Sequence, residues 1–140
     1  MTWEELEGLN KSAILAALKQ ADIHLVALEY YGEGDSGGIE WVEGYQDGQK
    51  VPFDATLMVP IKSLHYNYQT KINTVIEKTY DLEEAVRMFA YEVIEARHGG
   101  WENNSGGRGE MKICAKDGAE SVTLEHADFY REEHLSEYDI

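Results

Sequence analysis

Residues 32–40 read GEGDSGGIE and contain Gly-Asp-Ser-Gly-Gly, the string that surrounds the nucleophilic serine of trypsin-like proteases. Those enzymes consist of two β-barrels, and their histidine and aspartate lie far upstream of the serine. Here only 35 residues precede Ser36, and the one histidine among them, His24, lies in a predicted strand twelve residues before it. The motif also lacks the strand-to-helix setting of a nucleophile elbow. We therefore predict that Ser36 is not a nucleophile.

Metal binding is the next chemistry to consider, because a second glycine-rich segment, residues 99–110 (GGWENNSGGRGE), also carries oxygen ligands. Such segments suit calcium, but neither has the spacing of acidic residues found in an EF-hand. The histidines lie at positions 24, 65, 98, 126 and 134, and no two have the i, i+4 spacing of a helical zinc site. We predict no metal and no cofactor. A divalent ion that bridges the two segments stays open as the alternative.

Nucleotide binding is not expected from the second segment. Its glycines lead from a loop into a predicted strand, whereas phosphate-binding loops lead from a strand into the start of a helix. The segment has no lysine, and Arg108 is its only cation.

Trp101 is a large aromatic residue in an otherwise polar stretch. It either covers the core, with the neighbouring asparagines forming turns, or anchors a partner. In the second case both segments contribute to one binding surface, provided that they border neighbouring strands. The candidate binding residues are then Asp35, Ser36, Glu40, Trp101, Glu102, Asn103, Asn104, Arg108 and Glu110.

The charge balance limits the class of partner. The chain has 12 basic and 27 acidic residues, for a net charge of −15. Nucleic acids and anionic lipids bind through cationic patches, so we predict neither direct nucleic-acid binding nor membrane binding. A basic surface of another protein is the expected partner, although acidity alone also keeps a protein soluble. The oligomeric state is left open by these arguments.

Two helices are expected to position these segments. Residues 10–21 are predicted to form a helix, because they carry an apolar stripe at helical spacing and Asn10 can cap the first turn. In the preceding stretch, which could form a short turn of its own, Thr2 and Glu5 have the spacing of a capping box. A second helix follows Asp81, and its apolar face centres on Phe89 and Val93, which we predict to be buried.

Strands are predicted from β-branched and aromatic runs in residues 23–31, 39–45, 55–60, 71–80 and 110–126, the last of them a hairpin. We read GEGDSGGIE as a polar loop between two of these strands. Cys114, the only cysteine, is expected to be buried, and the acidic, aromatic tail at residues 127–140 is expected to pack. The prediction is a single α+β domain over residues 1–140, with an antiparallel sheet of about four to five strands and two main helices on one face.

The compartment is also an expectation from the sequence. Hydrophobic residues make up 43% of the chain, and no apolar run approaches the ~20 residues of a membrane helix. The beginning, MTWEELEG, is acidic where a signal peptide is basic. A cytoplasmic location is therefore expected.

Four segments also carry a resemblance to other proteins. NKSAILAALKQADI, GEGDSGGIE, DLEEAVRMFAYEVIEARHGGWENNSGGRGE and VTLEHADFY together resemble a family of small uncharacterised bacterial and phage proteins. The family pattern has a G-D-S-G-Q-I-E loop followed by an H-G-G-W-E-N-N-x-G-x-x-G-E loop. This chain differs by Gly38 in place of Gln and by an additional glycine in the second loop. The resemblance implies a bacterial or mobile-element origin and names no activity.

Two functions follow as hypotheses. The first is an acidic, non-enzymatic interaction protein that binds a basic surface of another protein, in its sharpest form an inhibitor that occupies a nucleic-acid groove. The alternative is a small metal-dependent or acid/base enzyme, in which carboxylates of the two glycine-rich segments act as ligands or acid/base groups. Those carboxylates are Asp35, Glu40, Glu102 and Glu110.

Overall fold

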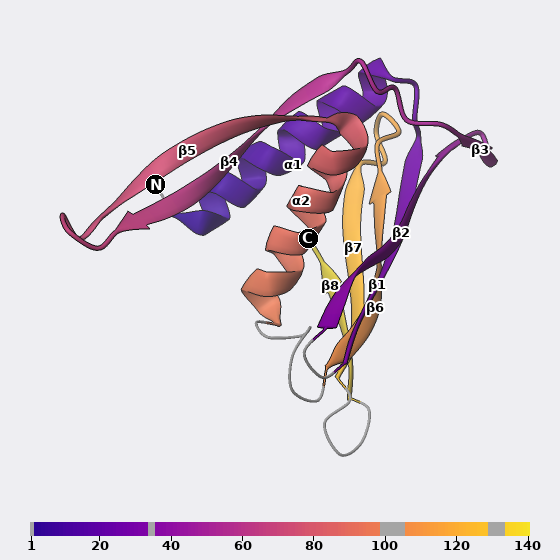
Figure 1. The fold of residues 1–140 in the computed structure, drawn as a ribbon. Helices are drawn as coiled ribbons and strands as arrows, with labels where there is room; N and C mark the ends of the chain where they lie inside the picture. Colours follow the sequence, from indigo (N-terminus) through magenta and orange to yellow (C-terminus); the bar gives the residue numbers. More distant parts are fainter. Residues whose placement is uncertain (1, 34–35, 99–105, 129–133) are drawn as a thin grey trace.

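The structure, a computed structural model, describes residues 2–33, 36–98, 106–128 and 134–140. Its elements are α1 (Trp3–Gln20), β1 (Leu25–Glu33), β2 (Ser36–Gln46), β3 (Gln49–Val51), β4 (Met58–Asn67), β5 (Ile72–Asp81), α2 (Leu82–Arg97), β6 (Gly107–Cys114), β7 (Ser121–Asp128) and β8 (His134–Asp139). Figure 1 shows both helices on one side of the larger sheet, with the β4–β5 hairpin running alongside α1.

The architecture is α+β with antiparallel sheets, as the sequence predicts. The strand count was predicted too low, because the described residues form a six-stranded sheet in the order β3-β2-β1-β6-β7-β8 and a separate two-stranded sheet, β4-β5. The two strands that were not predicted are the edge strands of the larger sheet, β3 and β8. β3 is a strand of only three residues, and β8 comes from the acidic tail, whose pattern gave no strand signal.

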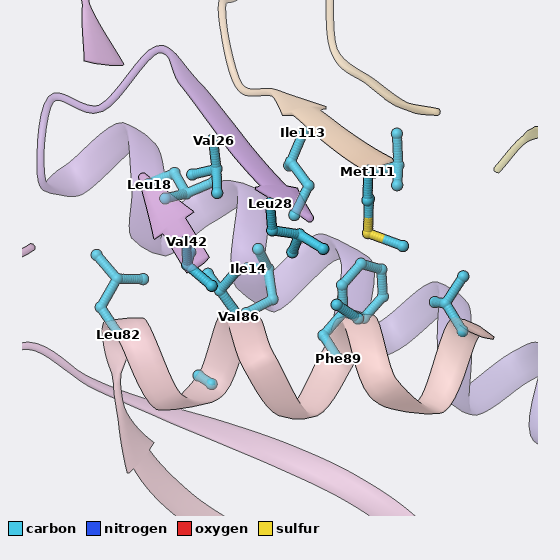
Figure 2. Packing of buried hydrophobic residues seen from close by; sticks show 14 of the residues in the cluster. Ile14, Leu18, Val26, Leu28, Val42, Leu82, Val86, Phe89, Met111 and Ile113 are labelled. Atoms are coloured by element: carbon cyan, nitrogen blue, oxygen red, sulfur yellow. The ribbon is translucent and has the colours of Figure 1, made fainter. Parts of the chain in front are cut away.

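The core lies between the larger sheet and the two helices, with a contribution from β4. Phe89 is 1% exposed and Val93 is fully buried, which confirms the prediction for this helix. Figure 2 shows Val86 and Phe89 pointing from α2 toward Leu28 and Met111 of the sheet. Asp81 caps the helix by accepting a hydrogen bond from the backbone N–H of Glu84 at 2.9 Å.

The first helix differs from the prediction in where it begins. Thr2, not Asn10, is the N-cap, and its hydroxyl accepts a hydrogen bond from the N–H of Glu5 at 3.2 Å. Asn10 lies inside the helix and is 5% exposed. Its side chain reaches the backbone of Lys62 in β4 instead. A residue type that favours caps was therefore misread, because its partner is distant in sequence.

Cys114 is also placed differently from the prediction. Met111, Ile113 and Ala115 are buried, whereas Cys114 is half-buried. Alternate residues of a strand point to opposite faces, so Cys114 belongs to the face of the sheet that the helices do not cover.

Among the described helices, none combines the length and the apolar character needed to cross a membrane.

Candidate functional site

The described parts of the two glycine-rich segments meet at one end of the larger sheet. Gly32 in β1 stands opposite Gly37 in β2 and also opposite Gly107 in β6. Gly107 in turn stands opposite Asp128 in β7, which pairs with His134 in β8. The adjoining ends of β1, β2, β6, β7 and β8 therefore lie at the same end of the sheet, at the bottom of Figure 1.

Much of what the sequence indicated as loop is strand. Ser36 begins β2 and is paired with Glu33, so only residues 34–35 separate β1 from β2. Residues 107–110 form the first half of β6. The sequence reading was wrong here because glycines inside a strand look like turn residues when the neighbouring strands are not known.

The predicted site residues separate into two groups. Asp35, Trp101, Glu102, Asn103 and Asn104 lie outside the described residues, so their role stays a prediction, as does the inert character of Ser36. The exposed members of the described group are Glu40, Arg108 and Glu110.

Glu40 lies at an irregularity of the sheet. Glu29 stands opposite Trp41, but the next residue of β1, Tyr30, stands opposite Ile39. Glu40 is the extra residue of this β-bulge. It is exposed on the strand but has no partner in the β1–β2 ladder.

Glu110 belongs to a row of glutamates that crosses the open face of the sheet. It stands opposite Glu29 in β1 and opposite Glu125 in β7, and Glu125 stands opposite Glu137 in β8. All four side chains are exposed. We call Glu29, Glu110, Glu125 and Glu137 the glutamate row.

The glutamate row works against the stability of the sheet. Like charges directly opposite one another on neighbouring strands destabilise a pair, by up to about 1 kcal/mol. No described residue forms an ion pair or a side-chain hydrogen bond with any of the four carboxylates. Folding therefore does not account for this arrangement, which makes it a candidate for a binding role.

A neighbouring carboxylate on the same face, that of Glu43, does have a hydrogen-bond partner and an ion-pair partner. Glu43 accepts a hydrogen bond from the Tyr45 hydroxyl at 2.6 Å and pairs with Lys50 at 3.0 Å. These two contacts, that of Tyr45 first, hold the pKa of Glu43 below its ordinary value. Among the described residues an ion pair meets Glu43 but none meets the glutamate row, although Arg108 and Lys112 line the same hollows as its carboxylates.

The inner face at the same end of the sheet holds a cluster of rings that we call the His–Tyr cluster: Tyr30, His98, His126 and Tyr138. The Tyr30 oxygen lies 2.5 Å from Nδ1 of His126, and both residues are fully buried. The His98 ring stacks on His126 with centroids 3.7 Å apart, and Tyr138 meets His98 edge-on at 5.4 Å.

Glycines of β6 make room for this cluster. A Cβ added to Gly107 would lie 2.8 Å from Cε1 of His126, and one added to Gly109 would overlap the Tyr30 hydroxyl and the backbone oxygen of Glu125. Gly107 and Gly109 therefore serve close packing inside the sheet. Two members of the His–Tyr cluster lie in segments that carry the resemblance, His98 in residues 81–110 and His126 in residues 122–130, and Tyr30 lies two residues before the first glycine-rich segment.

Metal binding finds no further support in the described part of the chain. There, no group of three or more His, Cys, Asp or Glu side chains is arranged to hold a metal ion.

Sequence reasoning missed most of these residues, although part of the signal was present. The hairpin turn near Gly118 sets Glu110 opposite Glu125, and Val122, Leu124 and His126 share the inward parity of one strand. The pairing of β1 with β6 joins segments about eighty residues apart, and no local pattern encodes it.

Comparisons with known proteins yield a family without an activity. No curated protein and no solved structure matches the chain. The model of a family of unknown function, DUF6878, matches residues 6–140. The chain, with its open glutamate row and its buried His–Tyr cluster, belongs to this family.

Proposed function

We propose that this protein is an acidic, non-enzymatic interaction protein that binds a basic surface of another protein through the open face of its six-stranded sheet. The observation that carries the proposal is the glutamate row, in which three successive cross-strand pairs place like charges opposite each other. A cationic partner would relieve this repulsion on binding. The energy stored in the free protein thus favours the complex.

The dimensions of the row suit an extended basic surface. Neighbouring strands lie about 4.8 Å apart, so four carboxylates in register span roughly 14 Å. Trp41 is half-buried at the Glu29 end of the row, and Tyr31 is 39% exposed beside it. Aromatic rings next to carboxylates suit arginine, which stacks on rings and bonds to carboxylates with the same planar group.

The net charge of −15 also attracts a basic partner over longer distances than the contacts of the glutamate row. It would speed the encounter with a basic partner and slow the encounter with nucleic acid. The sharpest form of the proposal is an inhibitor that covers the nucleic-acid-binding face of its partner, in the cytoplasm of a bacterium. The resemblance in sequence supports this bacterial or mobile-element setting.

The test compares two variants that lose the same charge. Glu110→Gln/Glu125→Gln removes the centre of the glutamate row, whereas Glu4→Gln/Glu84→Gln removes two exposed carboxylates from the first turns of the helices. The probe is a labelled arginine-rich peptide, with anisotropy read at several salt concentrations. We expect the row variant to bind about tenfold more weakly and the control to stay within about twofold. Equal losses in both variants would mean that net charge alone attracts the peptide, and the open face would lose its assignment.

A second candidate function rests on the His–Tyr cluster. A tyrosine oxygen 2.5 Å from an imidazole nitrogen is an arrangement that can transfer a proton, and it lies near the end of the sheet at which Gly32, Gly37 and Gly107 stand opposite one another. Its natural test is Tyr30→Phe, which keeps the ring and removes the hydroxyl. In a screen of ester, amide and phosphodiester substrates, an acid/base enzyme should lose about a hundredfold or more in rate with this variant. Absence of turnover in the native protein, or an unchanged rate in the variant, would remove this candidate.

The metal-dependent form of this candidate has its own readout. Calcium, magnesium, manganese and zinc should each be added to a thermal melt, because a ligand of the native state raises the midpoint. A rise that His98→Ala abolishes and His65→Ala leaves intact would support a site at the cluster. A midpoint that no cation moves would exclude a stabilising metal.

A further inference from the structure

We infer that this protein forms a dimer in solution through the free edge of β5, so that the β4–β5 hairpins of two copies join into one four-stranded antiparallel sheet. This inference concerns a surface remote in charge and position from the glutamate row and is independent of the proposed function. It rests on the two edges of the hairpin, on its charge and on its register.

The β4 edge of the hairpin is closed. The Asn10 side chain donates from Nδ2 to the Lys62 carbonyl at 2.8 Å and accepts from the Lys62 N–H through Oδ1 at 2.9 Å. Asn10 thus replaces a neighbouring strand at this point. Pro60, two residues earlier on the same edge, has no N–H to offer. These are two of the devices by which proteins prevent an edge strand from pairing with another chain.

The β5 edge carries neither device. Lys62 stands opposite Glu77, and in an antiparallel ladder opposite residues exchange either both backbone hydrogen bonds or none. Since Asn10 occupies both groups of Lys62, the N–H and C=O of Glu77 point away from β4. The same holds at every second residue, which includes Asn73, Val75 and Thr79. All four are exposed, and within the described part of the chain no strand pairs with this edge.

Exposed apolar side chains gather on the same hairpin. They include Tyr68 at 86%, Ile72 at 58% and Val75 at 42% exposure, together with Met58 and Tyr66. A two-stranded hairpin is only marginally stable in water by itself, and further strands stabilise it. The hairpin therefore gains from an added strand in a way that the six-stranded sheet does not.

The net charge of the hairpin favours a second copy of this chain as the partner at the β5 edge. Residues 58–81 contain three lysines and two carboxylates, a net charge of +1 in a chain whose total is −15. Two copies repel each other over most of their surfaces, and the hairpin is where they approach at the smallest electrostatic cost. A strongly basic partner would be drawn instead to the glutamate row.

The β5 sequence fits self-pairing in one register. Only the β5 residues whose N–H and C=O groups point away from β4 can form hydrogen bonds with the β5 strand of a second copy. This condition limits the two-fold axis that relates the two strands to a few positions. If the two-fold axis that relates the two β5 strands passes through Ile76, residues 72–80 of one copy pair along their whole length with residues 72–80 of the other. Ile76 then stands opposite Ile76 of the second copy, and Ile72 stands opposite Tyr80 of the second copy. An axis at Glu77 would set two glutamates opposite each other, which is unfavourable. The Ile76 axis also places Val75 opposite Glu77 twice in the dimer.

This register gives a matched pair of variants. Val75→Glu would create two like-charge pairs across the interface, and Val75→Lys would create two ion pairs. Both lose the same apolar contact with Leu64 within the hairpin. Sedimentation of the full chain should reveal a reversible dimer at concentrations up to about 1 mM. We expect Val75→Glu to raise the dimer dissociation constant about tenfold and Val75→Lys to leave it equal or lower it.

Added salt supplies a second readout. It should strengthen the dimer, because it screens repulsion between two acidic chains, whereas it should weaken binding of a basic peptide to the glutamate row. The two proposals can therefore fail separately. A chain that stays monomeric over the whole concentration range, or a dimer that responds equally to both Val75 variants, would overturn the inference.

Cross-linking fixes the register. In a Cys114→Ser background, which removes the only native cysteine, Ile76→Cys should form a disulfide-linked dimer on mild oxidation, since opposite residues of a non-hydrogen-bonded pair lie about 4.5 Å apart at Cα. Thr79→Cys, which would stand opposite Asn73 of the second copy, should not. Equal cross-linking at both positions would contradict the proposed axis.

Discussion

The open face of the six-stranded sheet and the β4–β5 hairpin are both antiparallel and both exposed, yet their chemistry is opposite. The face presents a row of carboxylates directly opposite one another, and the hairpin presents apolar side chains and a net charge of +1. The face has its backbone hydrogen bonds satisfied within the sheet and exposes only side chains. The hairpin exposes backbone groups along β5. The negative charge of the open face therefore suits a basic partner protein. The unpaired β5 edge of the hairpin suits a second copy of the same chain.

The largest expected effect comes from Phe89, which packs between the covered face of the six-stranded sheet and the hairpin. This side chain is 1% exposed, points toward the large sheet and lines a groove together with Lys62, Ser63 and Leu64 of the hairpin. Phe89→Ala should lower the free energy of unfolding by about 3–5 kcal/mol. Denaturant titration followed by fluorescence and by circular dichroism should show a single earlier transition. Two separate transitions would mean that the hairpin and the large sheet unfold independently.

Gly109 tests the large sheet alone. Gly109→Ala would force a methyl group against the Tyr30 hydroxyl and the backbone of Glu125, so we expect a loss of about 1–3 kcal/mol or more. Gly38→Ala is the matched control, because nothing lies within 4 Å of a Cβ added there. Thermal melts that rank the two variants equally would show that β6 does not pack on Tyr30 as described.

Asn10 tests the hairpin alone. Asn10→Ala leaves the N–H and C=O of Lys62 without their side-chain partner, and we expect a loss of about 1–3 kcal/mol. Hydrogen exchange should show faster exchange at Lys62 and along β4, with the amides of β6 and β7 little changed. Protection at Lys62 that survives the substitution would mean that this edge is closed by something other than Asn10.

The glutamate row should respond in the opposite direction. Glu125 stands between two like charges, so Glu125→Gln relieves both pairs and should raise the free energy of unfolding by up to about 1 kcal/mol at low salt. The gain should shrink as salt is added, because these side chains are exposed. A destabilised variant would show that the row is neutralised in the free protein and would remove the argument for a cationic partner.

The smallest effect concerns Glu43, the paired carboxylate on the same face. Its bonds to Tyr45 and Lys50 lower its pKa in the folded state, so its contribution to stability is present above its ordinary value of 4.5 and is lost as the pH falls through the folded value. In Tyr45→Phe the larger of the two causes is gone, and the Glu43 pKa should rise toward 4.5. Carboxyl chemical shifts followed by NMR measure this directly. Unchanged titration of Glu43 would contradict the bond to Tyr45.

The sequence by itself determined the local features of this protein. The apolar stripe of α2 and its Asp81 cap, the α+β class and the acidic character all depend on neighbours within a few residues or on composition. These features are readable because helix periodicity, capping and net charge require no knowledge of distant contacts. The register of the β6–β7 hairpin belongs partly to this class, since its turn is local.

Only the tertiary structure decided where function can reside. The glutamate row exists because β1 lies beside β6, and the His–Tyr cluster exists because Tyr30, His98 and His126 come from three different elements. Asn10 closes a strand edge 52 residues away rather than capping its own helix. Sheet register joins segments far apart in the chain, and a shift of one residue would exchange the two faces. The pairing of strands thus determines which charges meet, and it is not encoded in any single segment.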